Sequence, residues 1–159
     1  NILFSGTNHI ILKNKNYLLK DLPFRKIKAK KVTFLKALFK APFATPSVII
    51  DRNLINKYMF NENLRYGEDY DLWLRILRHN NAIKLDNDLT YTYKHDYISN
   101  KKSLSSNLYQ MHKSNLDTFK NLLLNEEIFY YKFFIFVAFL FEFLKYYRRK
   151  IIKFYIEKI

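Results

Sequence analysis

The chain contains no cysteine, so it can form neither a disulfide nor a thiolate metal site. Glycine and proline are also scarce, at two and three of 159 residues, which argues against a disordered or low-complexity protein. Hydrophobic residues make up 49% of the chain and aromatic residues 18%, which is enough to bury a core. The length fits one domain or part of a larger one. Because the chain begins with Asn1 rather than Met, we expect a piece of a longer protein.

Negative charge is scarce as well, and the formal net charge is +14. The excess cations lie in two clusters, within residues 25–31 and 145–153. A basic protein suits nucleic acid, anionic lipid or phosphorylated substrates as partners. The sequence contains no recognisable nucleic-acid reader motif, so we expect no nucleic-acid partner.

A run of apolar residues long enough to cross a membrane is missing from the last predicted helix. Its run Phe133–Phe141 falls short of the roughly 20 apolar residues that a spanning helix needs. Rings beside cations suit a helix that lies on a membrane surface, where the rings enter the acyl boundary and the cations meet anionic lipid. We therefore predict contact with an anionic membrane surface by Phe133, Phe136, Tyr146, Tyr147, Arg148, Arg149 and Lys150. The alternative is a helix that packs on its own domain or on a partner.

Hydrophobic periodicity and turn residues predict an α/β fold. The predicted strands are Ile2–Ser5 and His9–Lys13, which can pair as a hairpin around Gly6, followed by Ser47–Ile50, Ala82–Leu85 and Leu89–Lys94. The predicted helices are Val32–Lys40, a segment capped by Asp51 that runs to Tyr58, Glu68–His79, Leu104–Leu124 and an aromatic helix that begins at Glu126-Glu127. Loops are expected at Leu22–Lys31, Phe60–Tyr66 and Lys94–Ser103.

Three carboxylates gather in the segment Gly67–Arg75, at the start of a predicted helix. Asp69 shares the inner face with Leu72 and Trp73, so it suits either a general base or a buried helix cap. Asp71 precedes Arg75 by four residues, the favourable order for a helical ion pair. Glu68 suits either a substrate contact beside Asp69 or neutralisation of the helix dipole.

Two further polar motifs have a functional and a structural interpretation. Asp86-Asn87-Asp88 has the spacing of an Asp-X-Asp metal motif, but its position between two predicted strands favours a hairpin turn. His95 opens a polar loop after a strand. As a metal ligand it would need partners that the sequence does not clearly supply, so it remains a weak metal candidate.

The order of these segments resembles the second half of a family 2 inverting glycosyltransferase with the GT-A fold. The resemblance rests on Thr45-Pro46-Ser47-Val48-Ile49-Ile50, Phe60-Asn61-Glu62, Gly67-Glu68-Asp69-Tyr70-Asp71-Leu72-Trp73-Leu74-Arg75, Tyr93-Lys94-His95 and Ser103-Leu104-Ser105. It implies a division into the acceptor-side half of the catalytic domain at residues 1–105 and a helical, membrane-associating tail at residues 106–159.

The resemblance also implies site roles. Asp69 becomes the base that deprotonates the acceptor hydroxyl, with Glu68 as its neighbour in acceptor or donor contacts. Thr45 and Ser47 lie on the strand beneath the site, and His95 belongs to a loop that closes over the donor diphosphate. The donor would be a nucleotide-sugar and the acceptor a glycan or a lipid-linked sugar, in the synthesis of a bacterial surface polysaccharide (lipopolysaccharide, O-antigen or capsule). The enzyme would lie on the cytoplasmic face of the plasma membrane.

Such a family member holds Mg²⁺ or Mn²⁺ on the donor diphosphate with an Asp-X-Asp in its N-terminal half. Nothing before Asn1 is present, and Asp86-Asn87-Asp88 follows the Glu-Asp helix, which is the wrong order to replace that motif. We therefore expect no metal site in this chain and no activity from these 159 residues alone. The alternative from another class is a membrane-surface or partner-binding helical module without catalysis.

Overall fold

The computed structural model describes residues 3–12, 27–93, 104–156 and 158. Four strands form one sheet: β1 (Phe4–Leu12), β2 (Ala29–Val32), β3 (Val48–Ile50) and β4 (Ala82–Tyr93). Their order is β2-β4-β1-β3; β1 and β4 are parallel, and the two outer strands pair antiparallel with them. A mixed sheet with helices confirms the predicted α/β class.

The predicted hairpin around Gly6 is wrong, because β1 runs through that position without a turn. Gly6 pairs with Val48 on one side and with Lys84 on the other. A Cβ atom at this position would lie 2.4 Å from the Phe43 ring. The glycine therefore allows a ring to pack on the strand rather than the chain to reverse.

The predicted hairpin at Asp86-Asn87-Asp88 is also wrong, because β4 is one strand of 12 residues. The pairing with β1 shifts register between Gly6 and Asn8 and again between Asn8 and His9, which marks a bulge. The Asn8 amide donates to Asp86 Oδ1 at 3.3 Å and to Asp88 Oδ1 at 3.2 Å. The neighbouring strand β1 thus supplies hydrogen bonds to polar residues whose local sequence is typical of a turn.

Residues 22–40 contain a strand that the sequence did not predict. β2 occupies Ala29–Val32, across the end of the predicted loop and the first residue of the predicted helix, because Lys31 and Val32 pair with Ile83 and Ala82 of β4. The expected short helix follows as α1 (Phe34–Phe39), whose N-cap Thr33 accepts a hydrogen bond from the Lys36 N–H. Residues 13–26 lie outside the described part of the chain.

The central segments agree with prediction except at Thr45 and Ser47, which were expected on a strand but lie in a 3₁₀ turn before it. A 3₁₀ turn, η2 (Thr45–Ser47), leads into β3, and Asp51 caps α2 (Arg52–Tyr58) by accepting the Asn53 N–H at 2.8 Å. The acid-rich helix α3 covers Glu68–His79, as predicted. It ends at Asn80, whose N–H donates to the Ile76 carbonyl.

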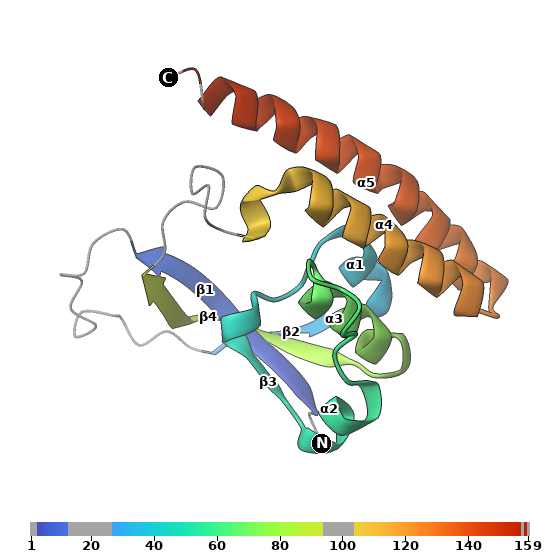
Figure 1. Cartoon of the computed structure of the whole chain (residues 1–159). Coiled ribbons are helices and arrows are strands. Elements are labelled where there is room, and N and C mark those ends of the chain that lie inside the picture. Colours follow the sequence, from blue (N-terminus) through green and yellow to red (C-terminus); the bar gives the residue numbers. More distant parts are fainter. Residues whose placement is uncertain (1–2, 13–26, 94–103, 157, 159) are drawn as a thin grey trace.

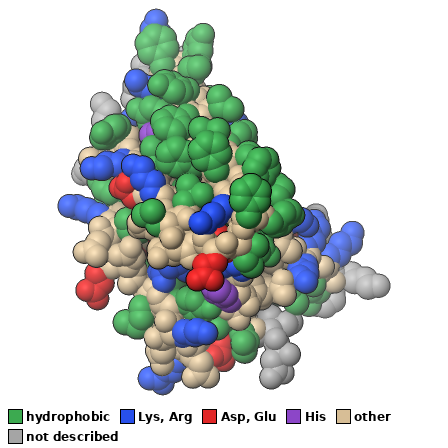
Figure 2. Space-filling model, turned by 90° about the vertical axis from the view of Figure 1, so that its right-hand side faces the viewer, with side chains coloured by type: hydrophobic (Ala, Val, Ile, Leu, Met, Phe, Trp, Pro, Cys, Tyr) green, Lys and Arg blue, Asp and Glu red, His purple; other side chains and the backbone are tan. Residues whose placement is uncertain are grey.

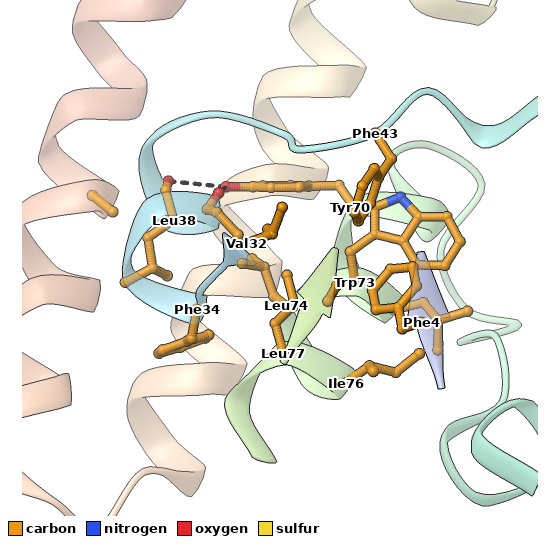
Figure 3. Packing of buried hydrophobic residues seen from close by; sticks show 14 of the residues in the cluster. Phe4, Val32, Phe34, Leu38, Phe43, Tyr70, Trp73, Leu74, Ile76 and Leu77 are labelled. Carbon is orange, nitrogen blue, oxygen red and sulfur yellow. Dashed lines mark hydrogen bonds between the residues drawn. The ribbon is translucent and has the colours of Figure 1, made fainter. Parts of the chain in front are cut away.

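The inner face of α3 makes the centre of the hydrophobic core. Leu72, Leu74 and Ile76 are completely buried. Trp73 and Phe43 both pack on Phe4, with ring centroids 5.2 and 5.0 Å from that of Phe4, and Figure 3 shows the three rings together. This ring cluster joins α3 to β1 and to the segment before η2.

Two long helices, α4 (Leu108–Asn125) and α5 (Phe129–Ile156), follow a 3₁₀ turn, η3 (Leu104–Ser106). They lie side by side, with α1 and α3 between them and the sheet (Figure 1). Phe119 of α4 and Ile135 and Ala138 of α5 belong to the same buried cluster as Trp73. The division into residues 1–105 and 106–159 stays a prediction.

Candidate active site

The N-terminal turn of α3 is built on a glycine in the left-handed conformation. Gly67 has φ 63° and ψ 19° as the N-cap, a conformation that costs other residues free energy. A Cβ atom here would also lie 3.1 Å from Asn115 Oδ1 of α4. Ser114, the preceding residue of α4, donates to the Tyr66 carbonyl. The long helix α4 thus shapes the turn that presents Glu68 and Asp69.

The Asp69 carboxylate is half-buried and carries two hydrogen bonds. Oδ2 accepts the Thr45 hydroxyl at 2.5 Å, and Oδ1 accepts the Tyr70 N–H at 2.7 Å. These donors fix the orientation of the carboxylate and leave further lone pairs for an incoming hydroxyl. The structure thus brings together two predicted site residues, Thr45 and Asp69.

The other predicted residues of this region are placed differently. Ser47 is buried, and its hydroxyl donates to the Ala44 carbonyl at 2.7 Å, so it stabilises η2. Glu68 is half-buried, and no described residue forms a hydrogen bond with its carboxylate. His95 lies outside the described residues.

Asp71 and Arg75 form the predicted structural ion pair. Arg75 Nε donates to Asp71 Oδ2 at 2.8 Å, and the side chain of Asp71 is only 5% exposed. The guanidinium also donates to the carbonyls of Tyr58 and Met59, and these hydrogen bonds attach the C-terminal end of α2 to α3. The pair therefore holds the loop before the acid cluster in place.

Tyr70 links the acid cluster to α1. Its hydroxyl donates to the carbonyls of Ala37 and Leu38, each at 2.9 Å, as the dashed line to Leu38 in Figure 3 indicates. Burial raises the pKa of Tyr70 well above its usual range, with a smaller contribution in the same direction from Glu142. The phenol therefore acts as a fixed hydrogen-bond donor to α1, while the backbone N–H of the same residue donates to Asp69.

A buried polar cluster behind Gly67 was not predicted from the sequence. Glu142 of α5 is completely buried; it accepts the Asn115 amide at 3.0 Å and pairs with Lys145 at 2.6 Å. Arg149 and His112 lie 3.8 and 3.9 Å from Glu142 Oε1. Burial lowers the pKa of His112, which favours the neutral ring. The signal that could have revealed the cluster is Glu142 itself, a lone acid among the apolar residues 133–144, because a buried charge needs partners.

Asp86 is part of a surface ion pair rather than a metal site. Lys30 Nζ lies 2.6 Å from Asp86 Oδ2, and its hydrogen bond, with that from Asn8, lowers the pKa of Asp86. In the described part of the chain, no group of three or more His, Cys, Asp or Glu side chains is placed to hold a metal ion.

The far end of α3 is tied to the α4–α5 turn. Arg78 donates from Nε and Nη2 to the two carboxylate oxygens of the buried Glu126, which also accepts the Ile128 N–H at 3.0 Å. The guanidinium lies 4.1 Å from the centroid of the Tyr131 ring. These hydrogen bonds lower the pKa of Glu126 and raise that of Arg78.

The outer surface of α5 is apolar over most of its length. Figure 2 shows hydrophobic side chains gathered over the upper part of the molecule, where α5 lies. We call this surface the α5 band; its exposed residues are Phe129, Phe133, Phe136, Leu140, Phe141, Leu144, Tyr147, Ile151, Phe154 and Tyr155. None of the helices in the described ranges is both long and apolar enough to span a membrane.

The residues predicted to contact a membrane do not all lie on this surface. Phe133, Phe136 and Tyr147 belong to the α5 band, and Arg148 and Lys150 are exposed beside it. Tyr146 instead stacks on His112 with centroids 4.4 Å apart, and Arg149 reaches towards Glu142. The helical period turns these two side chains towards α4, which a linear cluster of cations and rings does not reveal.

Comparison with characterised proteins gives one distant relative. The chain is 29% identical over 117 residues to UDP-Glc:alpha-D-GlcNAc-diphosphoundecaprenol beta-1,3-glucosyltransferase WfgD of Escherichia coli. The alignment covers 74% of this chain and 42% of that protein, so the chain spans less than half the length of its relative. No protein-family profile and no solved structure gives a significant match. The chain is thus distantly homologous to a bacterial glycosyltransferase.

Proposed function

We propose that this chain forms the acceptor side of a GT-A glycosyltransferase that moves a sugar from a nucleotide-sugar to a glycan or lipid-linked acceptor with inversion. The observation that carries the proposal is the half-buried Asp69 carboxylate, oriented by Thr45 at the start of α3. The distant glucosyltransferase homology supports the reaction class. The relative's lipid-linked acceptor supports a role in bacterial surface polysaccharide synthesis.

In the proposed reaction Asp69 accepts the proton of the acceptor hydroxyl. The oxygen attacks the anomeric carbon of the sugar as the bond to the nucleoside diphosphate breaks, in a single displacement. The Thr45 and Tyr70 donors orient the carboxylate, which reduces the reorganisation needed at the moment of proton transfer. Glu68, which is half-buried next to Asp69, contacts acceptor or donor.

The proposed enzyme uses Mg²⁺ or Mn²⁺, which would supply stabilisation of the leaving diphosphate. The described residues offer no complete ligand set. We therefore assign the ligands to the remaining part of a longer protein and expect residues 1–159 alone to be inactive. Detectable sugar transfer by residues 1–159 in isolation would contradict that assignment.

Replacement of the base tests the proposal. In the full-length protein, Asp69→Asn keeps the size of the side chain but removes the proton acceptor. We expect turnover to fall by at least about 100-fold, the typical contribution of general base catalysis, with donor binding preserved. Glu62→Gln, at an exposed acid in the preceding loop, is the matched control and should retain turnover. Turnover of Asp69→Asn within about tenfold of wild type, or about 1.4 kcal/mol, would rule out this role.

The α5 band supports a contact with an anionic membrane surface at the cytoplasmic face. Exposed apolar patches of this extent mark interaction sites, and Arg148 and Lys150 beside the band suit anionic head groups. Vesicle flotation tests it: binding should require anionic lipid, weaken with salt and fall in Phe133→Ser/Phe136→Ser. Vesicle binding that changes neither with salt concentration nor in the Phe133→Ser/Phe136→Ser variant would contradict the proposal.

The same surface favours a second candidate, a membrane-surface or partner-binding module without catalysis. That candidate predicts that loss of α5 abolishes function, whereas Asp69→Asn affects stability alone. A sugar-transfer assay on the two variants separates the candidates.

A further inference from the structure

A cavity of about 530 Å³ lies between the end of α1 and the middle of α5. One wall is apolar and consists of Phe39, Phe141 and Leu144, with the Phe39 and Phe141 rings in edge contact at 6.1 Å. The remaining lining contains four cationic side chains, Lys40, Lys145, Arg148 and Arg149. The volume lies in the range of small-molecule sites.

The cations of this cavity are only partly neutralised. The buried carboxylate of Glu142 is shared by Lys145 at 2.6 Å and Arg149 at 3.8 Å. Lys40 and Arg148 are exposed, and neither forms an ion pair with a described residue. The cavity therefore carries a net positive charge beside a low-dielectric aromatic wall, an arrangement that favours an anionic ligand.

The apolar wall of the cavity is continuous with the α5 band. Leu144 is 65% exposed and Phe141 40% exposed, so both face the cavity and the band. Leu140 and Phe136 follow along the helix at spacings of three or four residues, which keeps them on one face. A ligand that satisfies both surfaces has an anionic head and a long apolar tail.

The cavity is connected to the proposed site. Lys40 and Ala41 line it, and the chain then runs through Pro42–Ala44 to Thr45, which donates to Asp69. Tyr70, next to Asp69, holds the carbonyls at the end of α1. Carbonyls at a helix C-terminus repel anions, so their hydrogen bonds to Tyr70 reduce an effect that opposes anion binding.

We propose that this cavity binds the phosphate or diphosphate head group of a lipid, with the lipid chain lying on the α5 band. The identification of that lipid as the acceptor rests on the proposed function. Arginine and lysine side chains bind phosphate oxygens through charge-assisted hydrogen bonds, and the apolar wall selects a lipid over a free phosphate.

Calorimetric titration of the protein with farnesyl diphosphate, farnesol and inorganic pyrophosphate, without nucleotide-sugar, tests the site. Lys40→Glu/Arg148→Glu should weaken farnesyl diphosphate binding at least about tenfold, because hydrogen bonds to charged groups contribute about that much. Arg52→Glu/Lys57→Glu on α2 makes the same charge change at exposed positions and should leave affinity within about twofold. Circular dichroism confirms that both variants fold.

The apolar wall has its own test. Leu144→Asn should weaken farnesyl diphosphate binding but leave pyrophosphate binding unchanged, whereas Ile49→Asn, at a position 73% exposed on β3, should change neither. Pyrophosphate binding as tight as that of farnesyl diphosphate would indicate a free-phosphate site and overturn the proposal. Equal binding of farnesol, or an unaffected Lys40→Glu/Arg148→Glu variant, would overturn it as well.

The outcomes separate this inference from the proposed reaction. Asp69→Asn leaves the cavity unchanged, so this variant should still bind farnesyl diphosphate. If the full-length wild-type protein binds farnesyl diphosphate but transfers no sugar, the proposed reaction is contradicted and the cavity assignment is not. If the wild-type protein transfers sugar but Lys40→Glu/Arg148→Glu binds farnesyl diphosphate as tightly as wild type, the cavity assignment is contradicted and the proposed reaction is not.

Discussion

The Thr45 hydroxyl donates to the Asp69 carboxylate at 2.5 Å, across 24 residues of sequence. Thr45 begins η2 directly after the segment that carries Phe43, and Phe43 packs on Phe4 of the sheet. Asp69 lies in the first turn of α3, whose Trp73 packs on the same Phe4 ring. One aromatic cluster thus sets the distance between the Thr45 hydroxyl and the Asp69 carboxylate.

Removal of the Thr45 hydroxyl should impair the proposed reaction. Thr45→Val preserves shape but removes one of the two hydrogen bonds that orient the Asp69 carboxylate. We therefore expect kcat to fall about tenfold, or about 1.4 kcal/mol, with the KM for the sugar donor unchanged. Thr45→Ser retains the hydroxyl and should stay within about threefold of wild type by the same reasoning. Steady-state kinetics of both variants distinguishes a loss of orientation, which lowers kcat, from a loss of binding, which raises KM. An equal fall in kcat in Thr45→Val and Thr45→Ser would contradict an orienting hydrogen bond.

Gly67→Ala should destabilise the fold. A side chain in the left-handed conformation costs about 1–2 kcal/mol, and the new Cβ atom would press on Asn115 Oδ1 at 3.1 Å. Gly67→Asn should cost less conformational energy, since Asn adopts this conformation more readily. Urea denaturation measures both. An unchanged midpoint for Gly67→Ala would show that the turn relaxes without cost.

Arg75→Met should be strongly destabilising, because it leaves the Asp71 carboxylate, 5% exposed, without its cation. We expect a loss of about 3 kcal/mol in the free energy of unfolding, as for other broken buried pairs. The double variant Asp71→Asn/Arg75→Met removes the stranded charge and should recover part of the loss. A single-variant loss below about 1 kcal/mol would place the pair among weak surface ion pairs.

Glu126→Gln should lower stability at neutral pH by roughly 1.5–3 kcal/mol, the contribution of hydrogen bonds to a charged group. The folded-state pKa of Glu126 lies below its ordinary value of 4.5, so its charge stabilises the fold above pH 4.5. That contribution is lost as the pH falls through the folded-state pKa. The stability difference between wild type and variant should therefore shrink below pH 4.5. A difference that stays constant down to unfolding would argue against the ion pair.

His112 should make stability pH-dependent in a higher range. Its folded-state pKa is lowered by burial, so the unfolded state binds the proton more tightly. Its contribution is present above the ordinary pKa of 6.5 and is lost as the pH falls below it, with a slope of at most about 1.4 kcal/mol per pH unit. His112→Phe keeps the stacking on Tyr146 and should remove this slope. The exposed His79, replaced by Gln, is the control and should leave the slope unchanged.

Sequence reasoning succeeded where the signal is local. The bounds of α3, the Asp51 cap and the Asp71–Arg75 pair follow from apolar periodicity and from spacings within one or two helical turns. It failed at Gly6 and at Asp86–Asp88, where turn-like residues lie inside long strands. There a partner strand supplies the hydrogen bonds and packing that override local preference.

The amino-acid sequence alone determined the α/β class, the acid-rich helix and the aromatic, basic character of the last helix, because each depends on neighbouring residues. Only the tertiary structure decided which groups meet. It placed Thr45 against Asp69, Asn115 and Glu142 behind Gly67, and Lys40 and Arg148 in the lining of one cavity. These groups come from segments dozens of residues apart, and only the packing of the core brings such segments together.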